Sequence, residues 1–165
     1  RSVLIRLRPT DETRRRVADF LDLADDLASP PPEAIRPIQD AIRATFAANF
    51  ANERGDDRSW APLALRTIKE RIKLGYGGAH PILIRSGDYR RSFVEADDPQ
   101  HVSESEIAGG VWKIQEGTAD KRAGTLEFGS DNVPARPVMA PGRSGEERIT
   151  EVIEYMFDRW FEEDQ

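Results

Sequence analysis

The residues whose types could do chemistry lie mainly between Lys69 and Arg91, where Gly75, Gly77 and Gly78 stand among basic side chains. The stretch reads KERIKLGYGGAHPILIRSGDYRR, and glycine beside cations is typical of a loop that cradles phosphate. A phosphate-binding loop, however, ends in Lys-Ser or Lys-Thr between a strand and a helix, and GYGGAHP does neither. The spacing of a dinucleotide fingerprint is also missing. We therefore interpret the glycines as part of a flexible loop.

Residues for catalysis or metal binding do not form a recognisable set. His80 and His101 are isolated, without the paired spacing that metal ligation or general-base work needs. Ser86 lacks the preceding glycine of a nucleophile elbow. The chain has no cysteine, which excludes thiolate chemistry and Cys-bound zinc. The sequence therefore predicts no enzyme, no metal and no cofactor.

Charge is distributed unevenly along the chain. The net charge is −6, whereas nucleic-acid-binding domains are usually basic. Residues 54–91 nevertheless hold nine Lys or Arg against four Asp or Glu, and residues 144–165 hold two against eight. Such asymmetry suggests that oppositely charged surfaces meet, within a subunit or between subunits. Two solvated faces would give the same pattern.

The elements that must position these residues fit one domain over residues 1–165, a length that can bury a core. No apolar run approaches the roughly 20 residues that cross a bilayer, and the N-terminal stretch does not have the form of a signal peptide. Residues 10–53 predict a helical hairpin or arm broken by prolines, with Ile35, Ile38, Ile42, Phe46 and Phe50 on one buried side of its second helix.

Residues 54–81 lack a core pattern, apart from a short helical piece near 67–73, and predict a mobile loop that becomes ordered on assembly. Residues 82–140 predict an antiparallel sheet that begins with a hairpin of RSFVEAD and HVSESEIA. Residues 144–163 predict an amphipathic helix that covers the sheet, with Ser144 and Glu147 as a capping box. The fold class is thus α+β: a small, mostly antiparallel sheet flanked by N-terminal helices and a C-terminal helix, with a long assembly loop.

Four short motifs, in order, resemble the phage virion-morphogenesis (tail-completion) family. They are the segment around WAPLALRTIK, then ILIRSGDYRRS, AGTLEFG and VPARPVM, spread between Phe50 and Met139. Matching positions are Phe50, Trp60, Pro62, Leu63, Thr67 and Lys69; Ile82, Leu83, Ser86, Gly87, Tyr89 and Ser92; Ala123, Glu127, Phe128 and Gly129; and Pro134, Ala135, Arg136, Pro137 and Met139. The chain departs from the family pattern at Arg122, Leu126 and Val138, which replace a tyrosine, a histidine and a phenylalanine.

The resemblance implies a structural protein at the head–tail junction or the head-proximal end of a phage tail. It implies a homo-oligomeric ring, with a hexamer as the expected form, in contact with connector and tail proteins. DNA would pass through the lumen without specific binding. The protein would be assembled in the host cytoplasm and located in the virion, with no membrane contact.

The same resemblance gives the candidate residues their roles. The assembly residues would be Trp60, Leu63, Arg66, Lys69, Arg71 and Lys73, with the cations facing acidic partner surfaces such as C-terminal helices. The structural motif residues would be Gly87, Phe128, Gly129 and Arg136. Trp60 has two readings, an anchor on the core or a partner contact, and we expect the partner contact. For Arg136 we expect bonds to backbone carbonyls or to Glu127. The alternative function is nucleic-acid binding through the basic loop 54–91.

Overall fold

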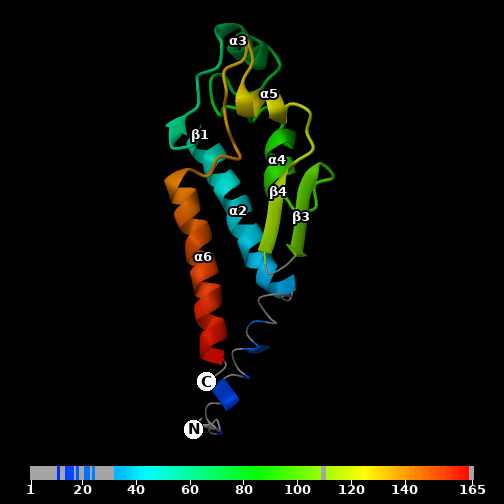
Figure 1. Ribbon diagram of the computed structural model, residues 1–165. Helices are drawn as coiled ribbons and strands as arrows, with labels where there is room; N and C mark the ends of the chain where they lie inside the picture. Colours follow the sequence, from blue (N-terminus) through cyan, green and yellow to red (C-terminus); the bar gives the residue numbers. More distant parts are fainter. Residues whose placement is uncertain are drawn as a thin grey trace, which may run out of the picture.

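The computed structural model describes residues 32–108 and 111–163, with separate positions between 11 and 24. The described part is α+β, as the sequence predicts, with helices around two short antiparallel hairpins (Figure 1). The expectations for the first helix of the arm lie outside the described ranges. None of the described helices is long and apolar enough to span a bilayer.

Helix α2 (Pro32–Asn52) is the central element, with α6 along one side and the larger hairpin along the other (Figure 1). Its buried side carries Ile35, Ile38, Phe46 and Phe50, which confirms the apolar stripe predicted for this helix. Pro37 lies inside the helix, in its second described turn. Proline has no backbone N–H, so the helix lacks one hydrogen bond near this end.

Strands β3 (His101–Ala108) and β4 (Val111–Thr118) form the larger hairpin, with His101 opposite Thr118 and Ala108 opposite Val111. The predicted hairpin of RSFVEAD with HVSESEIA is wrong, because β3 pairs with the segment that follows it in the chain. The sheet is also smaller than the predicted span of residues 82–140.

The residues expected to form the first strand form helix α4 (Asp88–Val94) instead. Tyr89 and Phe93 are one helical turn apart and both are buried, with Ser92 between them. Gly87 precedes the helix with a φ of 89°, a left-handed conformation that favours glycine. Over so short an apolar run, the alternation of a strand and the period of a helix are hard to distinguish.

Residues 54–81 are not a continuous loop. They contain β1 (Arg54–Gly55) and β2 (Arg58–Ser59), which pair with each other, and helix α3 (Leu65–Lys73). Helix α3 confirms the short helical piece predicted near residues 67–73. Ordering of this segment on assembly stays a prediction.

Aromatic side chains form the core, and Phe50 is at its centre. Its ring makes edge-to-face contacts with Trp60, Tyr89 and Phe93, with centroids 5.8, 6.0 and 5.9 Å away. Trp60 is only 5% exposed. The expectation that Trp60 is a partner contact is therefore wrong for this subunit. Its ring packs in a core to which segments far apart in the sequence contribute.

The C-terminal part closes the fold through α5 (Ala123–Phe128) and α6 (Gly142–Glu163). Helix α6 packs along α2 and meets the hairpin where Phe157 stacks on Trp112, with centroids 6.4 Å apart. It begins two residues before Ser144, so the predicted capping box does not mark its start. Oδ2 of Asp57 accepts the Arg143 backbone N–H at 2.8 Å, and a residue distant in the sequence thus caps this helix.

Candidate interaction surface

A buried polar cluster between α2 and the β3–β4 hairpin has residue types found in catalytic sites. Nε2 of His101 lies 2.8 Å from Oε2 of Glu116, which also accepts a bond from Arg43 at 2.9 Å. Nδ1 of His101 lies 3.1 Å from the carbonyl oxygen of Ser92. The side chains of His101 and Glu116 are 2% and 0% exposed. The pair is closed to a substrate, and its geometry ties the hairpin to α2.

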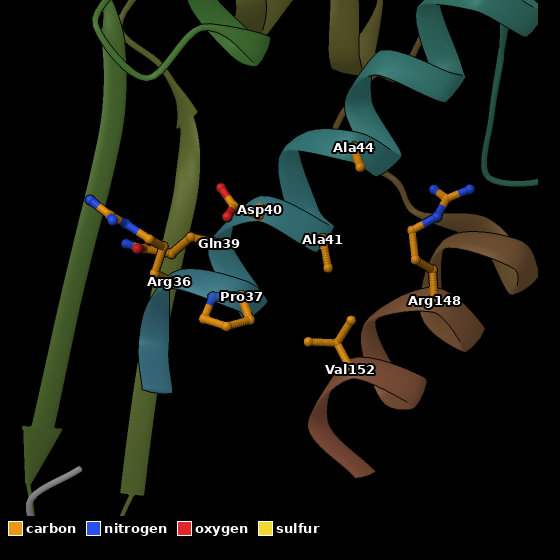
Figure 2. A pocket seen from close by; sticks show the side chains of 8 residues that line it. All are labelled: Arg36, Pro37, Gln39, Asp40, Ala41, Ala44, Arg148 and Val152. Atoms are coloured by element: carbon orange, nitrogen blue, oxygen red, sulfur yellow. The ribbon is translucent and has the colours of Figure 1, made fainter. Parts of the chain in front are cut away.

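A groove of about 860 Å³ runs between α2 and α6 (Figure 2). Ala41 and Ala44 line it from α2, and Arg148 and Val152 line it from α6. Arg148 donates to Oγ1 of Thr45 at 3.2 Å. The lining side chains include no serine, threonine or histidine, and their one carboxylate, Asp40, is paired with Arg43. Within the described ranges, no group of three or more His, Asp or Glu is arranged to hold a metal ion.

Helices α3 and α5 lie at the same end of the molecule (Figure 1), and several large apolar side chains of this end are in solvent. Leu65 and Ile72 of α3 are 75% and 60% exposed, Leu74 is 54% exposed, and Phe128 at the end of α5 is 84% exposed. We call this region the α3–α5 end. Exposed apolar residues gathered on one part of a surface are typical of protein–protein contact sites.

Basic side chains accompany these apolar residues. Arg66, Lys69 and Lys73 are exposed on α3, whose only acidic residue is Glu70. Leu63, just before α3, is half-buried against the core. Five of the six predicted assembly residues thus lie at or beside this end, and four of them, Leu63 among them, have side chains that are exposed or half-buried.

Arg71 has a different role from the one predicted. It is 5% exposed and donates to the carbonyl oxygens of Pro81 and Ile84 at 2.9 and 2.8 Å. These two bonds bracket Leu83, whose φ of 61° is strained for a bulky residue. Arg71 therefore holds the segment before α4 in place and is not a free cation on the surface.

Among the four predicted structural motif residues, Gly87, Gly129 and Arg136 have structural roles and Phe128 does not. Gly87 and Gly129 have φ values of 89° and 75°, and a Cβ at Gly129 would lie 2.9 Å from the Ala135 nitrogen. Arg136 is 5% exposed and donates to the carbonyl oxygens of Ala61 and Pro62 at 2.8 and 3.0 Å, which confirms its expected role. Phe128 is wrong as a structural residue, because it is 84% exposed.

Glu127 is not the partner of Arg136. Its carboxylate accepts the backbone N–H groups of Val138 at 2.6 Å and Met139 at 3.2 Å. Burial raises the pKa of Glu127, and the two backbone bonds oppose that shift. Glu127 thus fixes the backbone at Val138 and Met139, whereas Arg136 joins the same segment to residues 61 and 62.

Sequence reasoning missed the apolar part of the α3–α5 end. Leu65, Ile68 and Ile72 have helical spacing, which is the signal that predicts an amphipathic α3. In the structure Ile68 is half-buried while Leu65 and Ile72 stay exposed. Local spacing cannot distinguish a helix face that meets the core from one that meets a partner.

Comparisons with protein-family models, with curated proteins and with solved structures find no match for this chain. The resemblance to the tail-completion family therefore rests on the four motifs in the sequence. Function has to be argued from those motifs and from the α3–α5 end.

Proposed function

We propose that this chain is the subunit of a homo-oligomeric structural ring, of the kind that completes a phage tail or joins it to the head. The observation that carries this proposal is the α3–α5 end, where apolar residues up to 84% exposed lie beside the cations of α3. A subunit that works alone gains nothing from such a surface, whereas assembly removes it from water.

A ring also accounts for how the charge is distributed. Heterologous contacts use two different surfaces of one subunit and close into rings when the rotation permits. The α3–α5 end is basic and α6 is acidic, and the two lie in different parts of the molecule (Figure 1). The remaining elements of the proposal are a hexamer, neighbouring connector and tail proteins, DNA that passes through without specific binding, and a location in the virion.

The α3–α5 end can be tested by introducing charge where the proposal requires apolar contact. Wild type should sediment as a ring, and negative-stain micrographs should show closed particles. Leu65→Glu combined with Phe128→Glu should give monomers with an unchanged thermal midpoint, because both side chains are already in solvent. Val111→Glu is the matched control, since Val111 is 67% exposed on the hairpin away from this end.

Monomeric wild type at all concentrations would contradict the proposal, as would a double variant that assembles as well as the Val111→Glu control. The position in the particle has a separate test. Antibodies against the chain should label the neck or tail end of phage particles in micrographs.

The alternative, nucleic-acid binding through residues 54–91, is weakened by the contacts of its cations. Arg71 is buried, Arg54 pairs with Asp57 at 3.4 Å, and Arg91 pairs with Asp88. Fluorescence anisotropy with labelled duplex DNA decides between the two functions. The ring proposal expects no binding at physiological salt, and salt-dependent binding that is lost in Lys69→Ala with Lys73→Ala would favour the alternative.

A further inference from the structure

A second cavity, of about 450 Å³, opens at the α3–α5 end between α3, the segment before α4, and α5. Its walls are apolar where Leu63, Leu83 and Leu126 line it. Its charged lining residues are Arg71, Arg85, Arg122 and Arg136 against Glu70. We call this cavity the arginine socket.

Two of these arginines are buried without a counter-charge. Arg71 and Arg136 are each 5% exposed, and their guanidinium groups donate to neutral backbone carbonyls. Within the described ranges neither forms an ion pair. Burial lowers the pKa of Arg136, with no carboxylate opposing that shift. A buried cation that no anion balances is costly, so the socket favours an anionic occupant.

Unpartnered donors in the socket wall point to the same conclusion. Nε of Arg71 and the hydroxyl of Tyr89 are buried and find no hydrogen-bond partner among the residues that the structure describes. Burial first, and then the charges of Glu127 and Asp120, raise the pKa of Tyr89, which keeps the phenol protonated as a donor. Arg122 covers the Tyr89 ring at 5.2 Å while paired with Asp120. Buried polar groups in native proteins almost always have a partner, so these two unpaired donors add to the donor-rich character of the socket wall.

Helix α6 carries a row of exposed acidic side chains. The outer face of this helix carries Glu147, Glu151, Glu154 and Asp158 with Tyr155, all exposed. These positions recur at helical spacing, opposite the apolar face that packs on α2. Tyr155 is 63% exposed in the middle of the carboxylates. We call this face the α6 acidic stripe.

We propose that the arginine socket receives carboxylates of the α6 acidic stripe of a second copy of this chain. Arginine forms strong, directional bonds to carboxylates, and the apolar walls suit the ring of Tyr155. The stripe cannot enter the socket of its own subunit, because α6 runs along α2 away from the α3–α5 end (Figure 1). The contact is therefore between subunits. This inference rests on the proposed ring function and names the contact that closes the ring.

Charge reversal tests the contact with exposed residues only. The stripe variant carries Glu151→Arg and Glu154→Arg, and the socket variant carries Thr67→Glu and Arg85→Glu. Each variant alone should fold with the wild-type circular dichroism spectrum. The apparent dissociation constant of each should rise by about tenfold or more in sedimentation, because like charges then face each other.

An equimolar mixture of the two variants should assemble again. In the mixture, the unaltered socket of one variant meets the unaltered stripe of the other, and the two reversed surfaces also match. Native mass spectrometry should show complexes that contain both chains. The matched control carries Glu104→Arg and Glu106→Arg on the exposed face of β3 and should assemble like wild type.

The outcomes separate this inference from the proposed function. If wild type forms rings and the stripe variant assembles equally well, the ring stands and the socket contact is wrong. If both variants are monomeric and their mixture stays monomeric, the pairing of socket with stripe is also wrong, and another occupant fills the socket. If wild type never assembles, the proposed function fails and the inference fails with it.

Discussion

The side chains of Trp60 and Arg136 each donate a hydrogen bond to the backbone next to the other residue. Nε1 of Trp60 donates to the carbonyl oxygen of Pro137 at 2.9 Å, beside Arg136. Nε of Arg136 donates to the carbonyl oxygen of Ala61 at 2.8 Å, beside Trp60. Residues 60–62 and 136–137 are thus joined by reciprocal side-chain bonds across about half of the sequence. This contact places the basic segment on the core and sets where the α3–α5 end begins.

Trp60→Ala should therefore destabilise the subunit. We expect the free energy of unfolding to fall by about 3–5 kcal/mol, as for other large aromatic truncations in a core. Urea unfolding of the monomer measures this, and Leu65→Ala, at an exposed position, should change it by less than about 0.5 kcal/mol. Normal monomer stability together with a loss of assembly would restore the partner-contact role that the sequence suggested.

Arg136→Lys should also lower stability although it keeps the charge. A lysine ammonium has no planar fork to bridge the carbonyls of Ala61 and Pro62, so one buried acceptor loses its partner. The expected loss in the free energy of unfolding is about 1–3 kcal/mol. Arg143→Lys, at an exposed position of α6, is the control for the chemical change. Equal stability of the two variants would contradict the structural role of Arg136.

Gly129→Ala and Gly124→Ala should change stability in opposite directions. A Cβ at Gly129 meets the backbone of Ala135 at a φ of 75°, so we expect a loss of about 1–3 kcal/mol. A Cβ at Gly124 meets nothing within 4 Å, and alanine favours the helix there by about 0.5–1 kcal/mol. Thermal unfolding of both variants and of wild type under one condition measures the two changes in stability. A stabilised Gly129→Ala would show that the turn after α5 relaxes freely.

Low pH should remove the contribution of Asp120 to the stability of the folded subunit. The side-chain bond from Arg122 lowers the pKa of Asp120 below its usual value of 3.8, and burial opposes that shift. Because the folded pKa is the lower one, the stabilisation is complete above pH 3.8 and is lost as the pH falls below it. The difference in stability between wild type and Asp120→Asn should therefore shrink below that pH. A difference that is constant down to pH 2 would contradict the assignment.

Local patterns in the sequence were sufficient to predict the long helices and their buried sides. The apolar spacing from Ile35 to Phe50 identifies the buried side of α2, and the spacing from Ile149 to Phe157 identifies that of α6. Each pattern extends over several turns, so the helical period is unambiguous. Arg136 was also predictable, because a guanidinium between two prolines has few partners except backbone carbonyls.

Short segments were not predictable in this way. Residues 88–94 became a helix because Tyr89 and Phe93, four residues apart, both meet the aromatic core around Phe50. The start of α6 depended on Asp57, whose carboxylate reaches it from the distant β1–β2 turn. A run of seven residues holds too little local information to choose between these outcomes.

Composition alone shows that residues 54–91 are basic, glycine-rich and poor in apolar pattern. Which of those residues face solvent depends on contacts with distant parts of the chain. Trp60 and Arg71 are buried because partners far along the chain, Pro137 for one and Pro81 and Ile84 for the other, accept their N–H groups. Leu65, Ile72 and Phe128 stay exposed because no such partner reaches them from the part of the chain that the structure describes. Whether a side chain is buried depends on tertiary contacts within the folded subunit. The spacing of neighbouring residues does not predict those contacts.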